Sequence, residues 1–200
     1  MNNEQQKSAN WCENVIIADG DYIDHVAFEL SVNFERMIGR RIPKADLARW
    51  IDCVALDGGI REGDNQVQVA LIHSKNRTEL ENFTPGNYDQ EISGKAFSDN
   101  LGEFQLGSYP VEDLTDSDSF LLDMVRLVCA QKETRRVMIV PNAEHEGLYD
   151  DLRHALRDVD DEKRITVFAM QPMVGGNFRQ EILGYSLMSA LGIRGDEIKD

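Results

Sequence analysis

The chain has 200 residues, of which 42% are hydrophobic and 28% are charged, and its formal net charge is −15 at pH 7. This composition is ordinary for a globular protein, and no apolar run is long enough to cross a membrane. The negative charge repels nucleic acid over most of the surface, so binding to nucleic acid would need a local basic patch or a screening metal. Few basic clusters qualify, among them Arg40-Arg41 with Lys44, and Arg135-Arg136.

The cysteines and the N-terminal residues bear on the cellular compartment. Three cysteines without a C-x-x-C pair favour neither a zinc site nor a disulfide framework. Residues 1–10 are polar and lack the apolar core of a signal peptide, so we expect a cytoplasmic protein. We predict a disordered leader over residues 1–12, a single α/β domain over residues 13–195 and an acidic tail over residues 196–200.

The spacing of apolar residues predicts the elements in chain order. Apolar runs and alternating patterns predict strands over residues 13–18, 65–73, 103–111, 136–140 and 164–170. Apolar residues at helical spacing predict helices over residues 21–38, 44–55, 118–131, 148–158 and 180–191. The strand that contains Pro110 is expected at an edge of the sheet, because proline cannot donate a hydrogen bond to a neighbouring strand.

Residues 74–100 form a polar stretch that contains Pro85-Gly86 and has no sustained periodicity. A connection of this length is uncommon in a compact domain unless it carries a function. We therefore predict a long loop or insertion that is either a functional flap or a partly ordered segment whose structure its pattern does not reveal; in an interaction domain it could supply binding specificity.

The alternation of strands and helices predicts an α/β fold, with a mainly parallel central sheet in a three-layer α/β/α arrangement. Ligands of such folds bind in the crevice at the C-terminal ends of the strands. Any functional residues are therefore expected directly after the strands, or at the start of the helices that follow them.

Acidic residues stand at these positions. Asp19 and Asp21 follow the first strand, Asp118 opens a helix that also carries Asp123, and Glu144 follows the strand over residues 136–140. Carboxylates are hard oxygen ligands that suit Mg²⁺ or Mn²⁺. Carboxylates from three separate strand ends that converge on one crevice would suit metal-assisted phosphodiester hydrolysis. We predict Asp19, Asp118 and Glu144 as the catalytic residues of such a site.

Each acidic position also has a purely structural interpretation. The Asp-Gly pair at Asp19 fits a turn followed by a helix cap, and Asp116 and Asp118 fit the role of capping residues in the later helix. Glu144 and Glu146 fit residues that only complement the dipole of the next helix. His145, in the same turn, is typical of a surface histidine.

Three motifs resemble those of the PIN-like nucleases, and in particular of their NYN branch. They are Ile17-Ala18-Asp19-Gly20-Asp21-Tyr22-Ile23, then Asp118-Ser119-Phe120-Leu121-Leu122-Asp123, and finally the strand over residues 136–140 followed by Pro141-Asn142-Ala143-Glu144-His145-Glu146. Their order and placement agree over residues 13–170, although Glu144 or Glu146 stands where the family has a Ser-Gly-Asp-Ser-Asp turn.

The resemblance implies a PIN/NYN-like fold and a ribonuclease activity that depends on Mg²⁺ or Mn²⁺, with RNA as the substrate. Asp19 and Asp118 would be the primary metal ligands. Asp21, Asp123 and Glu144 would be supporting ligands, directly or through water.

Two other functions fit the same residues. In a phosphatase like the haloacid dehalogenases, Asp19 would be the nucleophile, Asp21 the acid/base, and Ser74 a phosphate-binding residue. In a non-catalytic interaction domain, the acidic surface would meet a basic protein partner. The apolar stripe of the last helix, with Tyr185 and Met188, fits either the core or the contact of a homo-oligomer.

Overall fold

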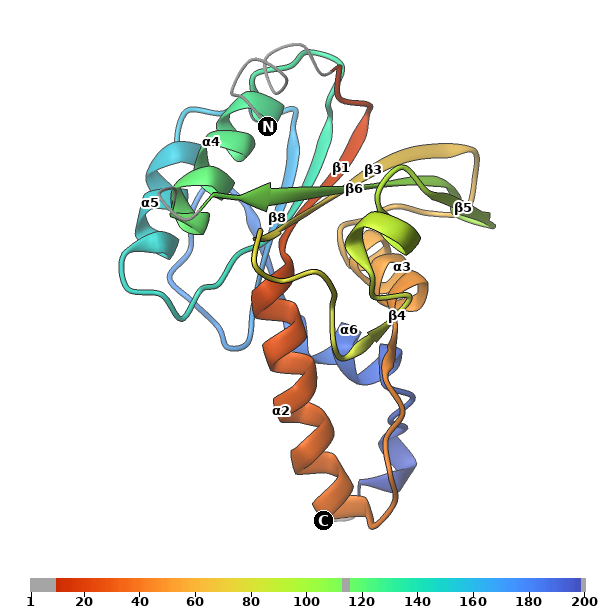
Figure 1. Ribbon diagram of the computed structural model, residues 1–200. Helices are drawn as coiled ribbons and strands as arrows, with labels where there is room; N and C mark the ends of the chain where they lie inside the picture. The colour runs from red at the N-terminus through yellow and green to blue at the C-terminus, as the bar shows by residue number, and fades with distance from the viewer. Residues whose placement is uncertain (1–9, 113–115, 199–200) are drawn as a thin grey trace.

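The computed structural model describes residues 10–112 and 116–198 (Figure 1). Within these residues a seven-stranded sheet has the order β5-β6-β3-β1-β7-β8-β9, and every neighbouring pair is parallel except β5 with β6. The strands are β1 (Asn14–Asp19), β3 (Asn65–Ser74), β5 (Ala96–Asp99), β6 (Gly102–Val111), β7 (Arg136–Val140), β8 (Arg164–Ala169) and β9 (Arg179–Ile182). The prediction of an α/β fold with a mainly parallel sheet is confirmed.

β1 is buried on both sides because helices pack against both of its faces. Ile16 and Ala18 belong to a core shared with helices α2 (Gly20–Ile38), α3 (Leu47–Asp57) and α6 (Leu183–Ala190). Val15 and Ile17 point to the other face, where they share a core with α4 (Ser117–Cys129) and α5 (Leu148–Leu156). The alternation of side chains along a strand accounts for this division.

Residues 74–100, expected to form a long loop or insertion, are partly ordered. They contain the short strand β4 (Phe83–Thr84), the single-turn π-helix η1 (Tyr88–Ile92) and β5. β4 pairs in parallel with β2 (Ala45–Asp46), and Leu80, Phe83 and Tyr88 are buried in the core on the α2 face. The segment was hard to predict because each element is short and is stabilised by distant residues rather than by its own periodicity.

Two further predictions are corrected within the described residues. The helix expected from residue 180 begins at Leu183, because Arg179–Ile182 pair in parallel with β8 as strand β9. β6 is an edge strand only in part, since β5 covers residues 102–105 and Pro110 lies beyond that pairing.

The ends of the chain are more ordered than expected. Trp11, placed in the predicted leader, is 6% exposed, and its backbone N–H donates to the Gln131 side chain; residues 1–9 lie outside the described part. In the predicted tail, the 3-10 turn η2 (Gly195–Glu197) places Glu197 against Arg40, with an Nε–Oε1 distance of 2.7 Å, whereas residues 199–200 are not described.

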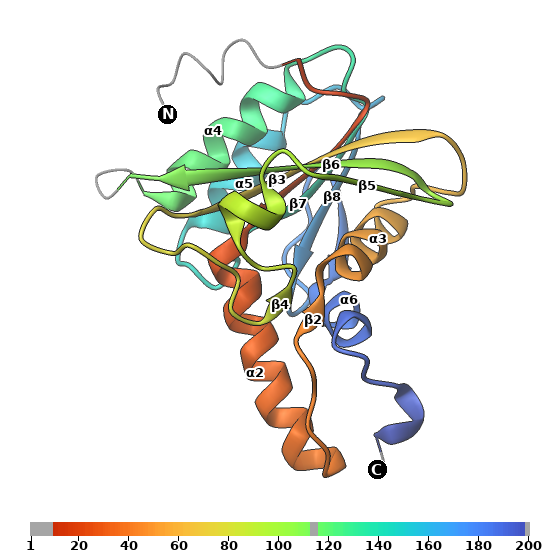
Figure 2. The same ribbon diagram turned by 45° about the vertical axis from the view of Figure 1, so that its right-hand side comes forward.

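The far half of α2 projects away from the sheet, and the C-terminal segment runs beside it (Figures 1 and 2). From Phe28 to Ile38 no side chain of α2 is fully buried. Among residues 10–112 and 116–198, no helix combines the length and the apolar character that crossing a membrane requires.

Candidate functional site

The topology indicates where a sheet of this kind binds a ligand, and we call this place the crevice. When the parallel strands are numbered in chain order, they lie in the order 3-2-1-4-5-6. Successive strands are therefore added on one side of β1 up to β6 and on its other side from β7 onward, so the strand order reverses between β1 and β7. In doubly wound sheets, ligands bind outside the C-terminal ends of the strands at this reversal. Here Asp19 is the last residue of β1, and the turn from Pro141 to Gly147 follows β7.

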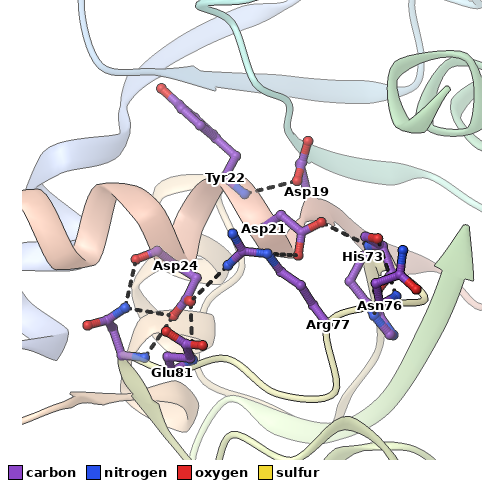
Figure 3. Close-up of polar contacts among 10 residues, drawn as sticks. Asp19, Asp21, Tyr22, Asp24, His73, Asn76, Arg77 and Glu81 are labelled. Carbon is purple, nitrogen blue, oxygen red and sulfur yellow. Dashed lines mark hydrogen bonds and ion pairs between the residues drawn. The ribbon is translucent and has the colours of Figure 1, made fainter. Parts of the chain in front are cut away.

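Asp19 combines a structural and an electrostatic role at this crevice. It caps α2, where its Oδ1 accepts the backbone N–H of Tyr22 at 3.0 Å (Figure 3). The residue is 7% exposed, and burial, together with the nearby carboxylates of Asp21 and Asp118, raises its pKa to about 6. The interpretation of Asp19 as a helix cap is thus correct. The carboxylate of Asp19 also lies near two other carboxylates, those of Asp21 and Asp118.

Asp118 reaches the same crevice from α4. Asp116 caps that helix by accepting the N–H of Asp118, so the side chain of Asp118 is free to point elsewhere. Its Oδ2 lies 2.8 Å from Nδ1 of His145, and Nε2 of His145 lies 3.0 Å from the amide nitrogen of Asn142. The other carboxylate oxygen of Asp118, Oδ1, is buried and has no hydrogen-bond partner among the described residues.

His145 is therefore more than a surface histidine, although its side chain is 56% exposed. It links Asp118 on α4 to the turn after β7, and its charge when protonated would act on Asp19, whose pKa it lowers. The sequence signal for this role is its place in a turn that follows a buried strand.

Glu144 lies on the same turn but faces Tyr22. Burial raises the pKa of the Tyr22 hydroxyl, and the Glu144 carboxylate beside it raises the pKa further. Glu144 is exposed, and its backbone N–H donates to the side chain of Asn142. The structure thus brings Glu144 to the rim of the crevice, next to Tyr22, rather than between Asp19 and Asp118.

Asp21 and Asp24 hold the segment that follows β3 (Figure 3). Asp21 accepts the backbone N–H of Ser74 at 2.8 Å. The acid/base and the phosphate-binding residue of the phosphatase hypothesis are therefore in contact. Asp24 is 3% exposed and accepts the backbone N–H groups of Glu81 and Asn82 at 3.1 and 2.8 Å. Arg77 lies between the two carboxylates, with N–O distances of 3.9 and 4.0 Å.

Gly20 is required by close packing at this point. His73 and Tyr88 stack with ring centroids 3.6 Å apart, and a Cβ atom on Gly20 would lie 2.5 Å from the Tyr88 hydroxyl oxygen. It would also lie 3.1 Å from the backbone oxygen of Ile72. The glycine of the Asp-Gly-Asp motif therefore lets β3 and η1 approach the start of α2.

We expect Gly20→Ala to destabilise the fold by about 1–3 kcal/mol, because an inserted methyl group must displace the buried Tyr88 ring. Thermal unfolding of the variant measures the loss. Gly175→Ala is the control, since a Cβ atom there meets nothing within 4 Å. An unchanged melting temperature for Gly20→Ala would show that Tyr88 moves aside at no cost.

Asp123 does not join the site. It lies five residues after Asp118, which corresponds to about 140° around an α-helix, so the two side chains leave α4 in different directions. Its side chain is 69% exposed and pairs with Arg126 at 3.3 Å. Among the residues that the structure describes, no group of three or more His, Cys, Asp or Glu is arranged to hold a metal ion.

The crevice thus holds two carboxylates, of Asp19 and Asp118, with His145 bonded to one of them. The N-termini of α2 and α4 both open toward it, because Asp19 caps the first helix and Asp118 lies in the first turn of the second. Helix N-termini favour negative charge. The arrangement suits a cation held between carboxylates, or the phosphate group of a ligand bound through such a cation.

Comparison with known proteins assigns the chain to a family without assigning an activity. No curated protein and no solved structure matches the chain at a significant level. A family described as a family of unknown function (DUF6621) matches residues 8–198, which is nearly the whole chain. The chain therefore belongs to this family of unknown function, DUF6621.

Proposed function

We propose that the crevice between β1 and β7 binds Mg²⁺ or Mn²⁺ and that the protein hydrolyses a phosphodiester bond, as a ribonuclease of the PIN/NYN type with a three-layer α/β/α fold. The observation that carries the proposal is the meeting of Asp19 and Asp118, from separate elements, at the reversal point of a parallel sheet. The raised pKa of Asp19 supports it, because excess negative charge in a crevice is relieved by a cation.

The residues present fit one ion of this type. Mg²⁺ is commonly held by one or two carboxylates together with water and substrate phosphate, rather than by a complete protein cage. Asp118, whose Oδ1 has no partner among the described residues, would hold the ion together with Asp19. Asp19 would use Oδ2, since its Oδ1 accepts the Tyr22 N–H.

The remaining residues have supporting roles. When bound, the metal would lower the pKa of a coordinated water and stabilise charge on the scissile phosphate. His145 orients the Asp118 carboxylate through its 2.8 Å contact. Glu144 lies at the rim beside Tyr22, and Asp21 keeps the segment after β3 in place through Ser74.

The test is a calorimetric titration with Mn²⁺ after treatment with EDTA, followed by incubation with labelled single-stranded RNA. We expect one saturable site in the native chain and its loss in Asp118→Asn. Asp123→Asn is the matched control, because Asp123 is an exposed aspartate on the same helix. It should bind Mn²⁺ and cleave RNA as the native chain does.

Other outcomes would reject the proposal in distinct ways. Absence of Mn²⁺ binding in the native chain would leave the non-catalytic interaction domain. Hydrolysis of p-nitrophenyl phosphate but not of RNA, with phosphate captured covalently on Asp19, would establish the phosphatase instead.

A further inference from the structure

Four arginines gather at the opposite, N-terminal edge of the sheet. Arg136, Arg164 and Arg179 begin the neighbouring strands β7, β8 and β9, and Arg61 lies in the connection between α3 and β3. Arg136 pairs with Arg164, and Arg179 pairs with Thr166, two residues after Arg164. Paired residues of parallel strands share a face, as do residues two apart, so the three strand arginines point to one face.

That face is the one covered by α3. An Nη1 atom of Arg136 donates to the backbone oxygen of Gly58, the residue after α3, at 2.7 Å. A hollow of about 310 Å³ opens beside this contact. Its walls include Gly58, Lys163, Arg164, Asn177, Phe178 and Arg179, and no carboxylate of residues 10–112 or 116–198 lines it.

The positive charge in this cluster is poorly compensated. Among the described residues, no carboxylate lies within 4.0 Å of a nitrogen of Arg61, Arg136 or Arg164, and the Arg179 guanidinium has one contact, with Glu181 at 3.5 Å. Burial lowers the pKa of Arg136, and the charges of Arg164 and Arg61 lower it further. The Nε atom of Arg136 is buried without a hydrogen-bond partner in the described part of the chain.

This cluster is unexpected in a chain whose net charge is −15. Arginine stays protonated in proteins, so neighbouring guanidinium groups repel one another unless an anion lies between them. Carboxylates are abundant in this chain, yet they do not fill the hollow. Planar guanidinium groups match the geometry of phosphate oxygens and bind them in pairs.

We propose that this hollow is a binding site for a small phosphate-bearing anion, held chiefly by Arg164 and Arg179, with the charge of Arg136 beside it. Its volume is at the lower end of the range for small-molecule sites, about 300–1,000 Å³. A long polyanion such as RNA would have to approach the acidic remainder of the molecule, whereas a small anion contacts only the arginines. The site is separate from the Asp19–Asp118 crevice and does not depend on the function proposed for it.

The test measures binding by calorimetry in EDTA, without added metal, using inorganic pyrophosphate, ADP and a single-stranded RNA as probes. We expect pyrophosphate or ADP to bind and the affinity to fall as salt is raised. Stronger binding of ADP than of pyrophosphate would identify a nucleotide as the source of the phosphate, and the reverse would identify a free polyphosphate.

Arg164→Gln and Arg179→Gln should each weaken binding at least tenfold, and the double variant should abolish it. Both residues are exposed, so the variants should fold, which their circular dichroism and melting temperature would verify. Arg36→Gln, an exposed arginine near the end of α2, and Asp118→Asn should leave binding unchanged. No binding of pyrophosphate and ADP at millimolar concentration, equal binding by the folded double variant, or binding of RNA alone would overturn the proposal.

Discussion

Asp19→Asn should abolish Mn²⁺ binding and RNA cleavage, and it should make the metal-free protein more stable at neutral pH. Asparagine has one uncharged oxygen where the native residue offers a carboxylate, so the affinity for a hard divalent cation should fall by at least about a hundredfold. The same oxygen can still accept the N–H of Tyr22 and cap α2, as asparagine does in many helices. Calorimetry and an RNA cleavage assay measure the two losses.

The gain in stability follows from the pKa of Asp19, which the fold raises from an ordinary value near 3.8 to about 6. The native state therefore binds the proton more tightly than the unfolded chain does, and the free energy of unfolding decreases as the pH rises from 4 to 6. Above pH 6 the full penalty of the buried charge is present, with an upper limit of about 3 kcal/mol. The asparagine variant carries no such penalty.

Thermal unfolding in EDTA at several pH values tests this expectation. At pH 7.5 the variant should melt above the native protein, and the difference should vanish as the pH falls toward 4. Asp123→Asn serves as the control and should show no such dependence, since its side chain is 69% exposed. A native-like melting curve together with unchanged Mn²⁺ binding in Asp19→Asn would reject both the electrostatic account and the proposed site.

Asp24→Ala should destabilise the protein by about 3 kcal/mol and loosen residues 79–92. The Asp24 carboxylate is buried and accepts the backbone N–H groups of Glu81 and Asn82. Hydrogen bonds to a charged group contribute about 1.5–3 kcal/mol each, and the variant leaves both donors without this acceptor. The backbone oxygen of Asn82 in turn accepts the N–H of Ala45, so the pairing of β2 with β4 should weaken as well.

For a chain of this length, such a loss corresponds to a fall in melting temperature of about 10 °C. Hydrogen exchange should show faster exchange of the amides of Glu81 and Asn82, whereas the amides of β1 should keep their protection. Glu29→Ala removes an exposed carboxylate from the same helix and should change neither measurement. Unaltered exchange in Asp24→Ala would mean that the segment is held by its apolar residues alone.

The resemblance to PIN/NYN nucleases and the geometry of the crevice agree on some residues and diverge on others. Asp19 and Asp118, the predicted primary ligands, lie close enough for the charge of one to raise the pKa of the other. Asp21 accepts a hydrogen bond from the backbone N–H of Ser74, and Asp123 is exposed and pairs with Arg126. The function proposed above therefore depends on two carboxylates and His145 rather than on the larger acidic set.

The sequence by itself determined the strands and helices whose apolar pattern is local. β1 was predictable because four consecutive apolar residues end in an aspartate, and α4 because its apolar face repeats at helical spacing after a run of capping residues. Since strands and helices alternate, the parallel sheet followed, and with it the expectation that Asp19 and Asp118 would share one edge. These features depend on contacts between residues that are near in sequence or on the general handedness of such connections.

Only the tertiary structure decided the features that depend on residues far apart in sequence. β9 is short and polar, so its pairing with β8 left no apolar pattern to detect. The segment of residues 74–100 is held by Asp24, 57 and 58 positions before its partners Glu81 and Asn82. The arginine cluster draws on four separate elements, because strand order and register, rather than spacing along the chain, determine which side chains meet at an edge of the sheet.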